Sequence, residues 1–259
     1  MKKKILLLSL VFILGTALIF TGCEPPGAPI PDPNDKGNGA SNEATDYWKQ
    51  DYILAVDPIM MRDPFMEVMG QIDGPIPYYY YEAAKLAGHS CGAISGAWTM
   101  TRKALEVLYP GDEVPVRGHI KIQAPGPADQ YYLGVFGEVF TYITGASEAS
   151  GFPGSSFGED FNRRYLLEYP EEKTDVAFPA VKWIFERKDT GKKVSVQFNL
   201  MMVQPPSTPD RQLTESKLAS GDVPAAELAD WQKYWNARAK FVLDNADKIH
   251  GFFIVDELN

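Results

Sequence analysis

Cysteine, positive charge and long hydrophobic runs are all scarce in this sequence. The 259 residues include two cysteines, Cys23 and Cys91, so once Cys23 is modified, as argued below, no intramolecular disulfide is possible. Lys and Arg number 25 against 34 Asp and Glu, which gives a formal net charge of −9. Attraction to nucleic acid or to anionic lipid headgroups through net charge is therefore excluded. Beyond residue 22, no run is long and apolar enough to span a bilayer.

The one long hydrophobic run lies at the N-terminus and predicts export. Three lysines precede an apolar stretch over residues 5–20, and Gly22-Cys23 follows. This order is typical of a signal peptide, and the small residue before Cys23 resembles a bacterial lipoprotein cleavage site. We expect residues 1–22 to be removed and Cys23 to be lipidated, which would anchor the protein to a membrane of the cell envelope, outside the cytoplasm. An uncleaved anchor or ordinary secretion would also place it outside the cytoplasm.

The segment that begins at Cys23 predicts a tether. Residues 23–45 are rich in Pro, Gly, Asn and Asp, and such a composition cannot bury enough apolar surface to fold, so we expect disorder. Residues 46–259 remain, a length that suits one domain with appendages. We expect its core over about residues 63–204 and a helical extension over residues 205–259.

Hydrophobic periodicity in the remaining chain predicts an α+β fold. Apolar spacing indicates helices over residues 82–88, 93–108 and 225–245, while residues 135–143 fit either a buried helix or a strand. Strands are expected over residues 114–122, 161–169, 181–187 and 193–200, the last two forming a hairpin. The prediction is therefore a mixed or antiparallel sheet packed against a long central helix, with a C-terminal helix.

Cys91 is the main functional candidate, because it lies in the turn Gly88-His89-Ser90-Cys91-Gly92 between two expected helices. At a helix N-terminus, unsatisfied N–H groups and the helix dipole favour a thiolate, the form that binds metals and attacks electrophiles. His89, two residues away, can share a ligand or move a proton. We interpret His89 and Cys91 as a candidate pair for catalysis and for metal binding.

The sequence around this pair resembles a known family. Residues 81–92, the Thr-Gly-Ala of residues 144–146 and the Phe-Asn-Arg-Arg of residues 161–164 resemble the FmdE family of formylmethanofuran dehydrogenase proteins, in its bacterial stand-alone members. The resemblance covers about residues 63–245. It implies an α+β core with a transition metal, zinc in the first place, held by His89 and Cys91. Some members end in a zinc finger, but no cysteine follows Cys91, so this chain has none.

Two ligands leave a metal site incomplete. A catalytic zinc usually has three protein ligands and a structural zinc four, so the rest must come from elsewhere in the fold. The candidates are Asp129, Glu138, His119 or water, and the sequence does not rank them. A histidine in a strand, as expected for His119, is more often an ordinary polar residue than a ligand. His250 is a weaker candidate still.

Arg163 and Arg164 are the candidate residues for binding a cofactor. Successive side chains of a strand point to opposite faces, so at most one of the two would face a site. A guanidinium beside a metal would suit a carboxylate or phosphate group of a ligand. The alternative interpretation is a solvated pair that balances Glu168, Glu171 and Glu172.

Three functions stay open at this point. The first is a membrane-tethered metal-binding domain, acting as an enzyme or as a carrier. The second is a cysteine-dependent hydrolase or transferase, in which His89 or His119 activates Cys91. The third is a lipoprotein that binds a small molecule or a partner, with Cys91 merely packed. The many Tyr and Trp residues leave a homodimer open, and we do not expect formylmethanofuran chemistry, because resemblance of fold does not carry a reaction with it.

Overall fold

The computed structural model describes residues 47–203 and 211–258, without the side chains of residues 211–214. Within the described part of the chain, no helix is long and apolar enough to cross a membrane. The predicted signal peptide, the lipidation of Cys23 and the tether all fall outside the described residues.

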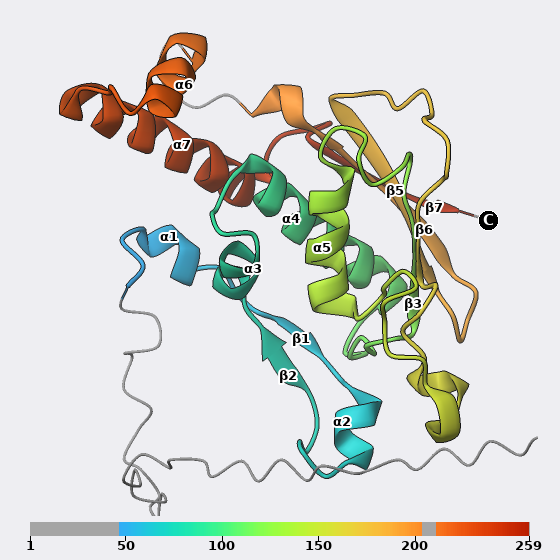
Figure 1. Ribbon diagram of the computed structural model, residues 1–259. Coiled ribbons are helices and arrows are strands. Elements are labelled where there is room, and N and C mark those ends of the chain that lie inside the picture. Colours follow the sequence, from blue (N-terminus) through green and yellow to red (C-terminus); the bar gives the residue numbers. More distant parts are fainter. Residues whose placement is uncertain (1–46, 204–210, 259) are drawn as a thin grey trace, which may run out of the picture. The chain divides into compact units, whose positions relative to one another are not determined.

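A five-stranded mixed sheet with the strand order β4-β3-β5-β6-β7 is the main layer of the fold (Figure 1). Strands β3 and β4 run parallel, and every other neighbouring pair is antiparallel. The strands are β3 (Ile120–Gln123), β4 (Leu167–Glu168), β5 (Ala180–Arg187), β6 (Lys193–Asn199) and β7 (Phe253–Leu258). The predicted hairpin of β5 and β6 is confirmed, with Glu186 paired to Lys193 beside its turn.

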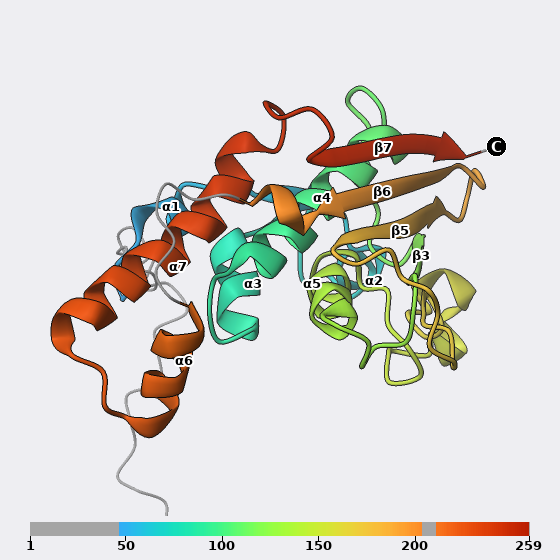
Figure 2. The same ribbon diagram turned by 90° about the horizontal axis from the view of Figure 1, so that it is seen from above.

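Helices cover one face of this sheet, so the predicted α+β class is confirmed. Strand β5 alternates, with Val181, Trp183 and Phe185 buried toward the helices and Lys182 exposed on the other face. Figure 2 shows the helices to one side of β5, β6 and β7. The covering helices are α4 (Gly92–Leu108) and α5 (Leu133–Thr144). Helix α7 (Ala225–Asn245) packs against α4, with α6 (Arg211–Ser220) beside it.

The long central helix is α4, and a glycine lets it lie close to the sheet. Gly96 faces Phe198 of β6, and a Cβ atom at residue 96 would lie only 2.2 Å from Cε1 of that ring. Such a distance is far inside van der Waals contact, so no larger residue fits without movement. The same helix also packs against α5 and α7, which places its N-terminus where these elements meet.

The N-terminal part of the described chain forms a smaller ribbon beside this core. Strands β1 and β2 pair antiparallel, and α2 connects them (Figure 1). The turn after α3 then leads into α4. The elements are α1 (Asp51–Leu54), β1 (Ile59–Met61), α2 (Pro64–Val68), β2 (Ile76–Tyr78) and α3 (Tyr80–Leu86).

Two predicted strands are wrong in extent, and three strands, β1, β2 and β7, were not predicted. The strand expected over residues 161–169 is reduced to β4, because the backbone N–H of Arg163 donates to Phe152 and Tyr165 has a positive φ of 57°. The strand expected over residues 114–122 begins only at Ile120. The predicted C-terminal extension supplies β7, which adds a strand to the sheet beyond the helix that we expected there.

Candidate functional site

The turn between α3 and α4 carries both candidate residues. Gly88 follows the end of α3 with φ 77°, a left-handed conformation that glycine adopts without steric cost. Cys91 is the N-cap residue of α4 and is extended, with φ −153° and ψ 176°. The prediction that a helix begins near Gly92 is confirmed.

Buried hydrogen bonds at Ser90 hold this turn in place. The Oγ atom of Ser90 lies 2.7 Å from the hydroxyl of Tyr80, and the hydroxyl of Tyr52 donates to it at 2.9 Å. Tyr80 also contacts Oγ of Ser95 at 2.7 Å, inside α4. From α7, the indole N–H of Trp235 donates to the carbonyl oxygen of Ser90 at 2.8 Å. Residues of α1, α3 and α7 therefore hold Ser90 in place, and with it His89 and Cys91 on either side.

His89 and Cys91 line the same cavity, which has a volume of about 490 Å³. Its wall comes from the N-terminus of α4, the start of α5, the Phe178-Pro179 segment, α7 and the 3-10 helix η4 (Leu200–Met202). Most of the wall is apolar. Besides Tyr132 and Trp235, which also have apolar rings, the polar side chains that line it are Cys91, His89 and Arg238.

The thiol of Cys91 is half-buried, and this burial decides its protonation. Loss of solvation raises the pKa of Cys91 above its ordinary value, although the backbone N–H groups of Ile94 and Ala93 and the charge of Arg238 act in the opposite direction. The helix N-terminus therefore favours the thiolate as expected, but burial outweighs it. Near neutral pH, the thiol stays protonated.

The imidazole of His89 is exposed at the edge of the cavity. Its Nδ1 atom lies 3.2 Å from the carbonyl oxygen of Ala87, and its ring centroid lies 5.9 Å from that of Trp235. Because a carbonyl oxygen only accepts, the neutral ring carries its proton on Nδ1 and leaves the lone pair of Nε2 available. Nε2 is therefore free to accept a hydrogen bond or to bind a metal.

The described residues do not complete a metal site around this pair. Among them, no group of three or more His, Cys, Asp and Glu side chains could hold a metal ion. Asp129, Glu138 and His250 are exposed, and none of them lines the cavity. His89 and Cys91 thus supply two of the three or four protein ligands that zinc takes in proteins.

His119 lies at the other end of α4. It precedes β3, where Ile120 pairs with Arg187. The Nη1 atom of Arg187 donates to the carbonyl of Leu108, the last residue of α4. Because the 17 residues of α4 span about 25 Å, His119 cannot reach Cys91 at the opposite end.

Arg163 and Arg164 bind protein groups away from the cavity. The Nη2 atom of Arg163 lies 2.8 Å from Oδ1 of the buried Asp63, and Arg117 reaches Oδ2 of the same carboxylate at 3.2 Å. The Nε atom of Arg164 donates to the carbonyl of Gly151 at 2.7 Å. Both arginines therefore hold loops together in this structure, and neither lines the cavity with Cys91.

The arginine that does line the cavity is Arg238, which was not predicted from the sequence. Its guanidinium lies over the ring of Tyr234 at 5.6 Å, and Nη1 lies 3.4 Å from the hydroxyl of that residue. No carboxylate among the described side chains forms an ion pair with it. Arg238 follows Trp235 by three residues, and residues three apart lie on the same face of a helix. The apolar spacing of α7 could therefore have indicated that the side chain of Arg238 points to the same side as Trp235.

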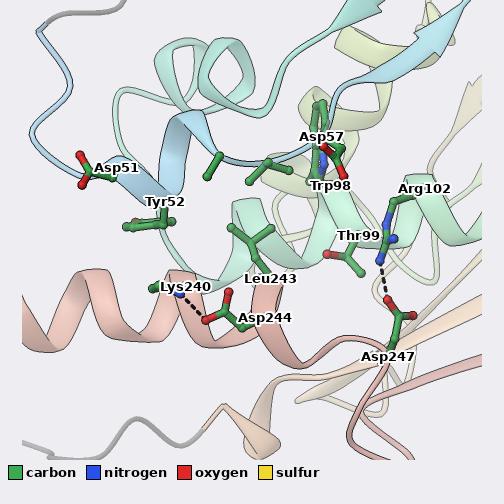
Figure 3. Close-up of a pocket in the computed structure, with 12 residues that line it drawn as sticks. Asp51, Tyr52, Asp57, Trp98, Thr99, Arg102, Lys240, Leu243, Asp244 and Asp247 are labelled. Atoms are coloured by element: carbon green, nitrogen blue, oxygen red, sulfur yellow. Dashed lines mark hydrogen bonds and ion pairs between the residues drawn. The ribbon is translucent and has the colours of Figure 1, made fainter.

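A second cavity of about 460 Å³ lies between α1, α4 and α7 and differs in its charges (Figure 3). Arg102 pairs with Asp247 at 2.9 Å, and Lys240 pairs with Asp244. Both cations of this cavity are therefore already neutralised by carboxylates, whereas Arg238 has no carboxylate partner among the described side chains. This contrast makes the Cys91 cavity the candidate functional site.

No family model matches the chain, and no curated protein matches its sequence. The resemblance to the FmdE family therefore rests on three short stretches of sequence, residues 81–92, 144–146 and 161–164. The function has to be argued from the geometry of the Cys91 cavity.

Proposed function

We propose that this protein is a lipid-anchored, extracytoplasmic protein of the cell envelope that binds a small organic anion in the Cys91 cavity. The observation that carries the proposal is the guanidinium of Arg238, which lines a largely apolar cavity without a carboxylate partner among the described residues. The anchor rests on the apolar run and on Cys23 in the sequence. It is independent of the cavity and can be tested separately.

A carboxylate is the anionic group that this site suits. Guanidinium groups bind carboxylates through two parallel N–H···O bonds, and such charge-assisted bonds are stronger than neutral ones. The low polarity of the surrounding wall strengthens the attraction further. Tyr132, Val135, Phe178 and Leu200 offer apolar contacts for the body of the ligand, while Cys91 offers a neutral S–H group.

Because the net charge of the protein is negative, binding of an anion depends strongly on the local positive charge of Arg238. With a formal charge of −9, the chain as a whole repels anions. An anion that binds must therefore be held by a local group, and Arg238 is such a group in the Cys91 cavity. Binding should depend on this one side chain more than on ionic strength or total charge.

The test measures hexanoate binding by calorimetry on the full chain in lipid nanodiscs, with empty nanodiscs as the blank. Arg238→Gln keeps a polar, hydrogen-bonding side chain, although a shorter one, and removes the charge, so we expect binding about 10- to 100-fold weaker. Arg102→Gln, which removes an arginine from the second cavity, serves as the matched control and should leave binding unchanged. Equal weakening by both variants, or no binding to the unmodified protein, would contradict the proposal.

Metal binding by His89 and Cys91 is a second candidate function. It is supported by their shared cavity and by the available Nε2 atom of His89. Further ligands would have to be water or the bound anion. Elemental analysis should find zinc in the unmodified protein and much less in both Cys91→Ser and His89→Gln. Zinc that is absent after loading, or that survives both substitutions, would rule this function out.

The cysteine-dependent hydrolase or transferase has weaker support. A nucleophilic cysteine needs a lowered pKa or an adjacent base, and burial raises the pKa of Cys91 instead. His119 is too distant to act as that base. His89 is exposed, and its nearest polar contact is the backbone of Ala87.

A further inference from the structure

Exposed apolar side chains surround the mouth of the Cys91 cavity. Phe178, Val135, Tyr132 and Met201 line the cavity and are still 38%, 37%, 48% and 68% exposed. Tyr131 is 54% exposed, and its ring stacks on Phe178 with centroids 4.3 Å apart and an angle of 9° between the planes. Single exposed apolar residues are ordinary, but a contiguous group beside a cavity marks a binding surface. We call these five residues the apolar rim.

Hydrogen bonds between two loops hold the rim in position. Nε2 of Gln130 donates to the carbonyl of Thr174 at 2.8 Å, and the N–H of Thr174 donates to Oε1 of Gln130 at 3.3 Å. The hydroxyl of Thr174 also donates to the carbonyl of Pro125. Tyr131 has φ 54°, a conformation that L-residues rarely adopt, and it keeps the ring over Phe178. The stack is therefore held by contacts within the protein itself.

The cavity and its rim have a polar end and an apolar end. Arg238 lines the cavity together with Cys91, and the ring centroid of His89 lies 5.9 Å from that of Trp235. These polar groups belong to the α7 side and to the N-terminus of α4. On the α5 side, the wall continues from Tyr132 and Val135 onto the rim without a charged side chain among the lining residues.

This polarity matches a molecule with a carboxylate at one end and a hydrocarbon chain at the other. We infer that the organic anion of the proposed function is a long-chain carboxylate of the fatty-acid type. Its carboxylate lies on Arg238, and its chain leaves the cavity across the apolar rim. The inference rests on the proposed function and narrows its ligand. A compact acid would occupy the cavity but would leave the rim exposed to water.

The test compares hexanoate, octanoate and decanoate with 3-phenylpropionate, on the full chain in lipid nanodiscs with empty nanodiscs as the blank. Each added methylene that is removed from water should tighten binding by about three- to fourfold. Decanoate should therefore bind far more tightly than hexanoate, and also more tightly than 3-phenylpropionate. Decyltrimethylammonium has the same chain with a cationic head and should bind weakly, because it cannot pair with Arg238.

Two matched tyrosine variants test the role of the rim. Tyr131→Gly removes half of the aromatic stack, and glycine accepts the positive φ of residue 131 without strain. It should abolish most of the gain from hexanoate to decanoate while leaving hexanoate binding nearly unchanged. Tyr165→Gly is the control, because Tyr165 is also exposed, at 64%, has φ 57° and does not line the cavity. It should leave the chain-length dependence intact.

The outcomes separate this inference from the proposed function. If affinity does not rise with chain length but Arg238→Gln still weakens hexanoate, the inference fails and the proposed function stands. If no carboxylate binds, both fail. The rim could instead bind a second copy of this chain, and sedimentation of the same samples would detect the resulting dimer. A dimer that Tyr131→Gly disrupts, with decanoate affinity unaffected, would identify the rim as an interface between copies and overturn the inference.

Discussion

The indole N–H of Trp235 donates to the carbonyl oxygen of Ser90 at 2.8 Å, across 145 residues of sequence. This bond joins α7 to the turn that carries His89 and Cys91. Since α7 also supplies Arg238, one helix both fixes the turn and brings the guanidinium to it. The polar end of the cavity therefore depends on the position of α7.

Replacing Trp235 with phenylalanine should loosen this end of the cavity. Trp235→Phe keeps an aromatic ring but removes the N–H donor, so the free energy of unfolding should fall by about 1–2 kcal/mol. Hexanoate binding should weaken in parallel, because the turn and Arg238 are no longer held together. Urea denaturation and calorimetry measure the two effects. Unchanged stability together with unchanged binding would show that the bond does not position the site.

Asp63 is a buried carboxylate shared by two arginines, and its loss should be costly. It is 2% exposed and pairs with Arg163 and Arg117. Asp63→Asn leaves Arg163 buried without a counter-charge, which should lower the free energy of unfolding by about 3–5 kcal/mol. The comparison is Asp256→Asn, whose surface pair with Lys182 should contribute about 0–1 kcal/mol. Similar urea midpoints for the two variants would contradict a structural role for the buried pair.

The sequence predicted the central helix and the hairpin because their signals are local. Apolar spacing defined α4, and the glycines around His89 and Cys91 marked its beginning. The strand expected over residues 161–169 failed because the backbone N–H of Arg163 donates to Phe152 and Tyr165 has a positive φ. The side chain of Arg163 points inward to Asp63, 100 residues earlier in the chain. No local pattern contains that partner. The pair of arginines therefore looked like a surface or ligand-binding feature when one of them is part of the interior.

The candidate site was predictable only in part, for a similar reason. His89 and Cys91 are two residues apart, so their common turn could be read from the sequence. Arg238 comes from a helix about 150 residues later, and only the packing of α7 against α4 brings it to the thiol. The partial burial of Cys91 also depends on the packing of the hydrophobic core, to which distant segments contribute. A helix N-terminus alone predicts the opposite pKa shift.

The reactivity of Cys91 should follow its raised pKa. Only the thiolate reacts with iodoacetamide, so the labelling rate at pH 7 to 8 should be lower than for the same residue in urea-unfolded protein. The rate should increase with pH and reach half of its maximum at a higher pH in the folded protein than in the unfolded one. Mass spectrometry of the labelled chain gives both curves. Faster labelling in the folded state would favour the hydrolase or transferase instead.

The contact between Gly96 and Phe198 should limit which residues α4 accepts. Gly96→Ala places a Cβ atom 2.2 Å from the Phe198 ring, so the helix or the ring must move, at a cost of about 1–3 kcal/mol. Gly92→Ala is the matched control, because nothing lies within 4 Å of a Cβ atom there and alanine favours helix. Thermal unfolding should thus show a lower midpoint for the first variant and an equal or higher one for the second. If both variants unfold like the unmodified protein, α4 is not held against β6 as closely as this contact requires.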